Sequence, residues 1–365
     1  MNKKIIYISD FFLDQIVGGC ELNDDEIIKS LVSMGHQVET KKSHIVTLDY
    51  VTNNYDCFYI ISNFCNLSFS VREFITYNCN YIIYEHDHKY LNTRNPAAYK
   101  DFKTDFVNIR NYFFYKNAKK ILCQTDFHKN IVFSNLKLNN IISLNGNLWS
   151  LDVLNKLREY SNKKKKDCVS ILDSNIKHKR TSRAISYCKS NNLEYNLVKD
   201  NDYLTFLDKL SNNKKLAFFP STPETLSRVV CEARMMNMGV VLNQMVGASH
   251  EPWFSLKGND LIDYMIDRRE FIIKVILDEI NSKPNKTDKE ISIITTFHKA
   301  EEYLESYLEN ITSQTIFNKC ELILVDSDSP GREQEIVKTY LDKYDNIHYY
   351  RYDYNFKPTI GHNIA

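Results

Sequence analysis

Short apolar runs alternate with amphipathic stretches over the first 155 residues. Residues 4–9 (KIIYIS) are apolar and β-branched, which is typical of a buried parallel strand. Apolar positions then recur at helical spacing from Leu22 to Val32, and Gly35 is placed to end that helix. Further strands are expected at 37–40, 57–62, 81–84 and 120–123, and helices around 71–76 and 104–116. This alternation predicts a doubly wound α/β domain with a parallel sheet over residues 1–155.

The alternation restarts after four lysines at 163–166, which are interpreted as a solvated linker. Strands are expected at 168–172, 194–198, 216–219 and 240–243, and helices at 180–190, 202–210 and 226–236. An amphipathic helix at 268–280 is placed to close this part of the chain. The pattern predicts a second Rossmann-like α/β domain over residues 166–281.

A polar segment with a proline, 282–290, is expected to link this domain to a third α/β pattern. Strands at 291–295, 321–325 and 347–352 alternate there with helices at 301–312 and 334–344. The sequence ends at Ala365, part-way through the pattern. Residues 291–365 therefore predict a truncated α/β unit with an unpaired sheet edge.

Composition disfavours several classes of function. The 47 basic and 46 acidic residues nearly cancel, which argues against nucleic acid as a partner, because a phosphate backbone needs a basic surplus. The nine cysteines are scattered without a CxxC pair, so we expect reduced thiols, no disulfide framework and no metal site. No apolar run approaches the roughly 18 residues of a membrane span, and the N-terminus lacks a signal peptide's apolar core. These features favour a cytoplasmic protein.

Two loops of the first domain carry candidate binding residues. Gly18 and Gly19 follow the first strand, where ligands of open α/β sheets bind and where glycine lets the backbone approach a phosphate. A plain turn with positive φ is the alternative. His86 and His88 follow the strand at 81–84, so each is a candidate for binding a substrate oxygen or transferring a proton, or else for a structural histidine.

The segment 218–234 (FFPSTPETLSRVVCEAR) places two carboxylates eight residues apart after an apolar strand. Glu224, near an expected helix start, can be a capping residue that the helix dipole favours. Glu232 lies among Val229, Val230 and Ala233 on a helix that is expected to be mostly buried. A carboxylate in a buried position needs a polar partner. The interpretation that the carboxylate simply faces water therefore fits Glu232 less well than Glu224.

This E-x7-E spacing resembles the donor-site motif of retaining glycosyltransferases of family 4, which have the GT-B fold of two Rossmann-like domains facing a cleft. Four further segments resemble that family in the expected order. They are the opening strand with GGCE at 18–21, GHQV at 35–38, NAKKILCQT at 117–125, and VVLNQMVG at 240–247 with Glu251. The resemblance covers about residues 1–280.

The resemblance implies a nucleotide-sugar donor between the two domains. Glu232 would accept hydrogen bonds from the ribose hydroxyls, and Glu224 would lie near the transferred sugar. Lys179 would neutralise the diphosphate leaving group, with Lys177 and Arg180 as helpers. The other expected donor-binding residues are Gly18, Gly19, Gly247 and Arg228, and the catalytic candidates are Glu224, His86 and His88.

Two positions depart from the family pattern. Ser174 stands where the family has an arginine, five residues before Lys179, and ETLS at 224–227 replaces the usual E-G-F-G. Arg228, one turn after Glu224, is a hypothetical source of the missing positive charge. No metal cofactor is expected for this module, because lysine and helix dipoles can stabilise the charge of the leaving group.

Residues 291–315 and 321–329 resemble the start of family 2 glycosyltransferases, which have the GT-A fold. The landmarks are TTF at 295–297, the acidic turn at 326–329, and GHN at 361–363. The resemblance implicates Thr296, Asp326 and Asp328 in a partial nucleotide site. A β-turn favoured by Asp and Ser is the alternative for the two aspartates. Mg or Mn is expected only for a complete GT-A module, whose metal motif is absent here.

These patterns favour a glycosyltransferase that moves a sugar from a nucleotide sugar to a glycan, lipid-linked or protein acceptor. A lipid acceptor would be compatible with peripheral membrane association. One alternative is a non-catalytic nucleotide-sugar-binding or scaffold module, and another is a sugar-nucleotide epimerase of the same fold. A dehydrogenase is disfavoured, because no GxGxxG follows any expected strand.

Overall fold

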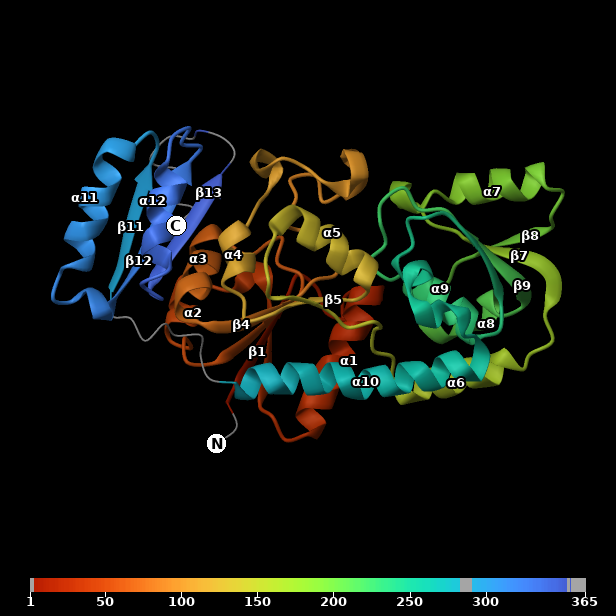
Figure 1. The fold of residues 1–365 in the computed structure, drawn as a ribbon. Coiled ribbons are helices and arrows are strands. Elements are labelled where there is room, and N and C mark those ends of the chain that lie inside the picture. The colour runs from red at the N-terminus through yellow and green to blue at the C-terminus, as the bar shows by residue number, and fades with distance from the viewer. Residues whose placement is uncertain (1–2, 283–290, 353–354, 356–365) are drawn as a thin grey trace. The chain divides into compact units, whose positions relative to one another are not determined.

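A computed structural model describes residues 3–282, 291–352 and 355 of the chain. The chain divides into two compact units, Met1–Lys283 and Pro284–Ala365. Every strand pair within these units is parallel, so both units are of the α/β class that the sequence predicts (Figure 1).

The first sheet of the first unit has six strands in the order β2-β1-β3-β4-β5-β6. Its strands are β1 (Ile5–Ser9), β2 (Val38–Lys42), β3 (Phe58–Ile61), β4 (Asn80–Tyr84), β5 (Ile121–Cys123) and β6 (Ile141–Ser143). The helices between them are α1 (Gly19–Ser33), α2 (Leu48–Thr52), α3 (Phe69–Asn78), α4 (Tyr112–Lys116) and α5 (Asp126–Leu136). Tyr7 pairs with Ile60, and Ile60 with Ile82, so β1, β3 and β4 form the central ladder.

Alternate side chains of the central strands pack on opposite faces of this sheet. Ile6 lies in one core with Val71 of α3, and Ile5 lies in the other with Ile27 of α1. Burial on both faces explains why these strands are continuous apolar runs in the sequence rather than alternating ones.

The second sheet of the first unit has four strands in the order β10-β9-β7-β8. Its strands are β7 (Lys166–Leu172), β8 (Tyr195–Val198), β9 (Asn213–Phe218) and β10 (Gly239–Leu242). Helices α6 (Leu151–Ser161), α7 (Thr181–Ser190), α8 (Tyr203–Leu210) and α9 (Arg228–Met235) accompany it. The lysine run is less solvated than expected, because Lys163 pairs with Asp208 at 2.9 Å and Lys166 begins β7.

Helix α10 (Gly258–Asn281) joins the two cores of the first unit. Its first half places Leu261 and Met265 in the core of the second sheet, and its second half places Ile272 and Ile276 in a core of the first sheet. Figure 1 shows α10 running beside α6 and on beneath the first sheet. The expectation that a helix at 268–280 closes the second domain is therefore wrong, because those residues pack against the first sheet.

The expected helix at 104–116 is also wrong for most of its length. Residues 106–108 form a short 3-10 turn, and Asn111 has φ 57°, a left-handed conformation that separates the turn from α4. Helices α2, α5 and α6 and strand β6 were not predicted from the sequence.

The second unit holds a three-stranded sheet in the order β11-β12-β13. Its elements are β11 (Ile291–Phe297), α11 (Glu301–Thr312), β12 (Cys320–Ser327), α12 (Glu333–Leu341) and β13 (Ile347–Tyr352). Leu304 and Leu308 of α11 pack with Leu322 and Leu324 of β12 and Val337 of α12. Every expected element of this unit is present. The GHN segment at 361–363 lies outside the described residues.

Candidate functional site

The loop between β1 and α1 approaches helix α9 at the start of α1. Gly18 caps α1 with φ −131°, and neither Gly18 nor Gly19 has a positive φ, so a left-handed turn is excluded here. A Cβ on Gly18 would lie 2.3 Å from Glu21 Oε2, and one on Gly19 would lie 3.2 Å from Arg228 Cδ. Close approach of the Glu21 and Arg228 side chains, rather than backbone conformation, therefore favours glycine at 18 and 19, and a Cβ at 18 would have to displace the end of the Glu21 side chain.

Glu224 and Lys179 form an ion pair beyond the carboxyl ends of β9 and β7. Lys179 Nζ lies 2.8 Å from Glu224 Oε1 and 2.9 Å from Oε2, and the side chains are 24% and 15% exposed respectively. Glu224 precedes α9 by four residues, in a segment that bridges to Val246. The alternative of a capping residue in the first helical turn is therefore excluded for Glu224.

Gly247 fixes the path of the segment that carries Glu224. Glu224 N donates to Met245 O at 2.7 Å, and Gly247 N donates to Glu224 O at 2.8 Å. A Cβ on Gly247 would lie 2.4 Å from Thr225 O and 2.8 Å from Glu224 O. Only glycine allows these two loops to run this close together.

Lys177 and Arg180 flank Lys179 in the loop after β7. Both are exposed, and Arg180 has φ 52° where the chain turns into α7. Neither forms an ion pair with another described residue. Their charges are thus placed in solvent beside the Lys179–Glu224 pair, where a polyanion can meet them.

Glu232 is buried on α9, and one of its oxygens already has protein partners. Oε1 accepts from Trp149 Nε1 at 2.9 Å and from the Tyr203 hydroxyl, and Arg228 Nε lies 3.5 Å away. The Arg228 guanidinium lies 4.3 Å from the centroid of the Trp149 ring. Oε2 accepts no hydrogen bond from any residue that the structure describes. Arg228 is thus engaged with Glu232 and Trp149 and makes no contact with Glu224 among the described residues.

His86 lies in a buried polar network at the carboxyl end of β4. Its Nε2 is 2.9 Å from Asp24 Oδ1, and its Nδ1 is 2.9 Å from the side-chain amide of Gln124. Burial opposes a charge on this imidazole, but Cys20 and Asp24 outweigh burial and raise the pKa of His86 to about 10. Both ring nitrogens of His86 are engaged by the side chains of Asp24 and Gln124, so neither is free to act as a general base.

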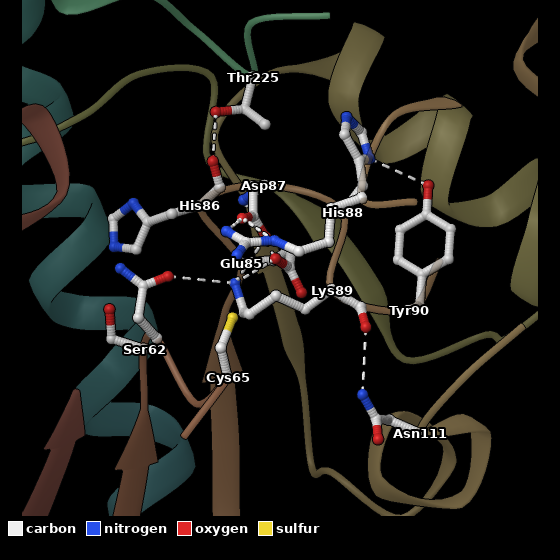
Figure 2. Close-up of polar contacts among 12 residues, drawn as sticks. Ser62, Cys65, Glu85, His86, Asp87, His88, Lys89, Tyr90, Asn111 and Thr225 are labelled. Carbon is white, nitrogen blue, oxygen red and sulfur yellow. Dashed lines mark hydrogen bonds and ion pairs between the residues drawn. The ribbon is translucent and has the colours of Figure 1, made fainter. Parts of the chain in front are cut away.

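His88 lies in the interior of the first sheet's core. Its Nδ1 is 3.0 Å from the Tyr90 hydroxyl, as Figure 2 shows, and its ring meets His128 edge-on at 5.2 Å. Burial lowers the pKa of His88 to about 4, so the ring is neutral at neutral pH. These contacts favour the structural alternative for His88. Of the two histidines, His86 lies nearer the other candidate residues.

A buried ion cluster supports the loop after β4 (Figure 2). Lys89 Nζ lies 2.5 Å from Glu85 Oε1 and 3.0 Å from Asp87 Oδ1, and Asp87 also pairs with Arg94. Burial opposes charge on Lys89 and on Asp87, but pairing outweighs it, so the pKa of Lys89 is raised and that of Asp87 is lowered. Charge pairs therefore hold this loop, which has no regular secondary structure.

Thr225 connects the loops of the two sheets in the first unit. Its hydroxyl donates to His86 O at 3.0 Å, and its carbonyl accepts from the Thr125 hydroxyl at 2.7 Å. The segment that carries Glu224 thus contacts the loop that carries His86. In the same way, Arg228 lies against Gly19.

The side chains of these networks that were not predicted from the sequence include Asp24, Trp149 and Tyr203. Asp24 accepts from the hydroxyls of Tyr7 and Ser62 as well as pairing with His86. Its place one turn before Ile27, on the apolar side of α1, was the pattern that pointed to a buried carboxylate. Trp149 and Tyr203 follow no local pattern, because only the tertiary fold brings them to Glu232.

The second unit places its candidate residues around one turn. Asp326 is fully buried, and its carboxylate accepts from Ser329 N at 2.9 Å and from the Tyr349 hydroxyl at 2.6 Å. Asp328 is exposed with φ 60°, in the segment that follows β12. Thr296 is half-buried on β11, one residue before the pair Phe297–Asp326.

Within 3–282, 291–352 and 355, no group of three His, Cys, Asp or Glu side chains is placed to hold a metal ion. None of the helices in those ranges is long and apolar enough to cross a membrane.

Residues 292–365 match the model of glycosyl transferase family 2, in agreement with the resemblance expected for the second unit. No curated protein matches the chain. Among solved structures, an alpha-glucosyltransferase in complex with UDP and a 13-mer DNA containing an HMU base is 11% identical, with a TM-score of 0.42, over 77% of this chain and 100% of that one.

Two further solved structures are similar at the same low level. HepE of Anabaena, in complex with UDP and glucose, is 12% identical with a TM-score of 0.45, over 76% of this chain and 92% of that one. A variant of TarM from S. aureus, in complex with fondaparinux, alpha-GlcNAc-glycerol and UDP, is 14% identical with a TM-score of 0.35, over 61% and 55%. The case for function accordingly rests on the side chains described above and on the family 2 match.

Proposed function

We propose that the chain is a glycosyltransferase whose first unit binds a nucleotide sugar where Lys179 and Glu224 meet the loops of the first sheet. The observation that carries this proposal is the Lys179–Glu224 pair, with Nζ 2.8 Å from Oε1. It joins a cation and a carboxylate from two different loops at the carboxyl edge of a parallel sheet, the edge at which open α/β sheets bind ligands.

The leaving group of such a reaction is a nucleoside diphosphate. Lys179 would move from Glu224 to the diphosphate, and the exposed Lys177 and Arg180 would add positive charge from solvent. Glu224 would then face the transferred sugar. Fixed cations that meet the developing negative charge lower the barrier to departure, so this part of the chemistry needs no metal.

The ribose would bind at Glu232. Its Oε1 is occupied by Trp149 and Tyr203, so the ribose hydroxyls would use Oε2 or displace the Tyr203 hydroxyl. Arg228 would act on Glu232 rather than on the diphosphate, since its guanidinium is stacked on Trp149. His86, whose ring nitrogens are both engaged by protein side chains, would hold its loop beside the segment of Glu224 instead of removing a proton.

A non-catalytic nucleotide-sugar-binding module is the second candidate. The observation that favours it is the engagement of Glu232 Oε1 by two protein donors, together with Ser227 at φ 76° where the family motif has glycine. Such a module would bind the donor without releasing the nucleoside diphosphate.

We further propose that the acceptor is a glycan, a lipid-linked sugar or a protein. The resemblance to family 4 also supports retention of the anomeric configuration as a proposal. The second unit would be the nucleotide-binding start of a GT-A domain, on the strength of its match to family 2.

Calorimetric titration of the full chain with UDP-, GDP-, ADP- and CMP-sugars, with and without manganese, tests donor binding. We expect one nucleotide to bind without metal, and Lys179→Ala to weaken it about tenfold or more, because a charge-assisted contact is lost. Lys214→Ala is the matched control, since Lys214 is exposed and pairs only with Asp167 at 3.6 Å among the described residues. Equal affinity of the Lys179→Ala and Lys214→Ala variants would contradict the proposed site.

A further inference from the structure

Three side chains contact the Glu232 carboxylate, and they differ in how deeply they are buried. Glu232 itself is 2% exposed, and Trp149, which donates to Oε1 at 2.9 Å, is 1% exposed. The Arg228 side chain is 9% exposed, with its Nε 3.5 Å from Oε1. Tyr203, whose hydroxyl donates to the same oxygen, is only half-buried. Among these three contacts, Tyr203 is therefore the one that lies nearest to solvent.

Trp149 is a fixed partner of Glu232. Its carbonyl accepts from Arg269 Nη1 at 2.9 Å, and its ring lies 4.3 Å from the Arg228 guanidinium. The preceding residue, Leu148, donates its backbone N–H to Asn23 Oδ1 of α1 at 3.1 Å, and its carbonyl accepts from Arg228. Contacts to the backbone and to the ring thus hold this tryptophan, and a ligand could displace it only by breaking several of them.

Tyr203 is a movable partner of the same carboxylate. It is the first residue of α8, whose start is capped by Asp202, since Asp202 Oδ1 accepts from Thr205 N at 2.8 Å. Lys199 and Asp202, on the chain just before it, are exposed. The Tyr203 ring can therefore turn to another rotamer while the helix start stays in place. Its other contact, from Arg228 Nη2 to the phenolic oxygen, is long at 3.5 Å.

The Tyr203 hydroxyl occupies a place that a ribose hydroxyl can fill. Burial and the Glu232 charge raise the pKa of Tyr203, so the phenol keeps its proton and donates it to Oε1. Trp149 and Tyr203 together use both lone pairs of Oε1. The two vicinal hydroxyls of a ribose match the two oxygens of one carboxylate, but Oε1 can accept one of them only when Tyr203 leaves. The buried carboxylate would then exchange one donor for another instead of losing it.

We propose that Tyr203 is a specificity-determining residue of the donor site. Its hydroxyl covers Glu232 in the free protein and is exchanged for a ribose hydroxyl when a nucleotide binds. The inference rests on the proposed binding of the ribose at Glu232. Because the contact with Tyr203 must be broken first, Tyr203 opposes binding and reduces the preference of the site for ribose over a sugar without these hydroxyls.

Calorimetric titration of the full chain and of Tyr203→Phe with UDP, GDP, ADP and CMP, and with the 2′,3′-dideoxy form of each, tests the exchange. We expect Tyr203→Phe to bind one ribonucleotide about tenfold more tightly than the unmodified chain does, because no charge-assisted hydrogen bond has to be broken. The dideoxy form should bind both chains equally. Tyr160→Phe is the matched control, since Tyr160 is also half-buried and does not contact Glu232 among the described residues.

A gain of affinity separates the exchange from a structural role, because loss of a structural contact does not strengthen binding. The inference is overturned if Tyr203→Phe binds the ribonucleotide with equal or lower affinity than the unmodified chain. An equal gain for the dideoxy form also overturns it, since the gain would then not come from the ribose hydroxyls.

Nitration of the unmodified chain by tetranitromethane, followed by mass spectrometry, guards against a variant that does not fold. We expect nitration of Tyr203 to become faster with a saturating ribonucleotide, because the ring moves from Glu232 to solvent. Tyr77, which is 60% exposed on α3, is the control and should react at an unchanged rate. Nitration of Tyr203 at an unchanged or slower rate would mean that the ring stays in place, which contradicts the exchange.

Glu232→Ala distinguishes a failure of this inference from a failure of the proposed function. If Glu232→Ala binds the ribonucleotide as tightly as the unmodified chain does, or if no nucleotide binds, the proposed ribose contact fails and the exchange fails with it. If Glu232→Ala weakens binding while Tyr203→Phe does not strengthen it, the ribose contact stands and only the role of Tyr203 is overturned.

Discussion

Lys179 and Glu232 are each paired with a protein group, and each is still placed to contact a ligand. Lys179 is held by Glu224, a contact that a diphosphate can replace. Glu232 presents one bound and one unbound oxygen on a mostly buried helix. The E-x7-E spacing identified the two carboxylates, but their partners come from distant loops and could not be predicted from the spacing.

Gly247 provides a test of geometry at a single residue. Its φ is not positive, so alanine would act only through its Cβ, 2.4 Å from Thr225 O. We expect Gly247→Ala to displace the segment of Glu224 and to weaken nucleotide-sugar binding about tenfold or more, as loss of a placed charged contact does. Calorimetry measures this, with Gly239→Ala as the control, because a Cβ there meets Lys215 Cγ at an ordinary 3.5 Å. Identical affinities of the two variants would refute the role assigned to Gly247.

The burial of His88 predicts that the folded chain loses stability as the pH falls. Its pKa is lowered to about 4 by burial, against an ordinary value of about 6.5. Between these values the unfolded chain takes up a proton that the folded chain does not, so the free energy of unfolding falls as pH falls through this window. His88 alone accounts for about 3 kcal/mol of that fall, at about 1.4 kcal/mol per pH unit.

Urea unfolding of His88→Phe at pH 7 and pH 4 measures this contribution. We expect the variant to lose less stability than the unmodified chain over that interval, while His128 continues to contribute in the same direction. His44→Phe, at an exposed histidine, is the control and keeps the full dependence. The same pH dependence in His88→Phe as in the control would show that His88 does not cause it.

At the scale of elements, the sequence predicts best the strands whose side chains are buried on both faces. The expected strands at 4–9 and 81–84 differ from β1 and β4 by one residue at one end, because a continuous apolar run between polar segments marks where a buried strand begins and ends. Helix α5 (DFHKNIVFSNL) was missed because polar residues interrupt its apolar positions, and its buried His128 is not apolar. The expected helix at 104–116 was overextended because Asn111 adopts a left-handed conformation, which asparagine tolerates better than most residues but does not require.

Helix α10 offers a prediction at the element scale. Ile276 is fully buried in a core of the first sheet, so Ile276→Ala should lower the free energy of unfolding by about 2–5 kcal/mol. Urea unfolding measures the loss, and Lys274→Ala, at an exposed position on the same helix, should change stability by less than about 0.5 kcal/mol. Equal effects of the two substitutions would mean that the second half of α10 does not pack on this sheet.

At the scale of the whole molecule, the chain combines a unit with two parallel sheets and a unit with one. The alternation of strands and helices was enough to predict this α/β architecture, including each element of the second unit. The contacts that join the two sheets of the first unit run through Thr225, Arg228 and α10, and no local pattern in the sequence reports such contacts. For the same reason, the sequence identified candidate residues for the site but did not predict the hydrogen bonds and ion pairs that connect them.

Release of nucleoside diphosphate from a nucleotide sugar, measured for the full chain and for Glu224→Gln, tests the proposed transferase most directly. The account predicts metal-independent release with one donor, slowed about a hundredfold or more in Glu224→Gln, while Lys214→Ala keeps the unmodified rate. No release from any UDP-, GDP-, ADP- or CMP-sugar would contradict the account in favour of a binding module. An unchanged rate in Glu224→Gln would place the chemistry outside the site built around Lys179 and Glu224.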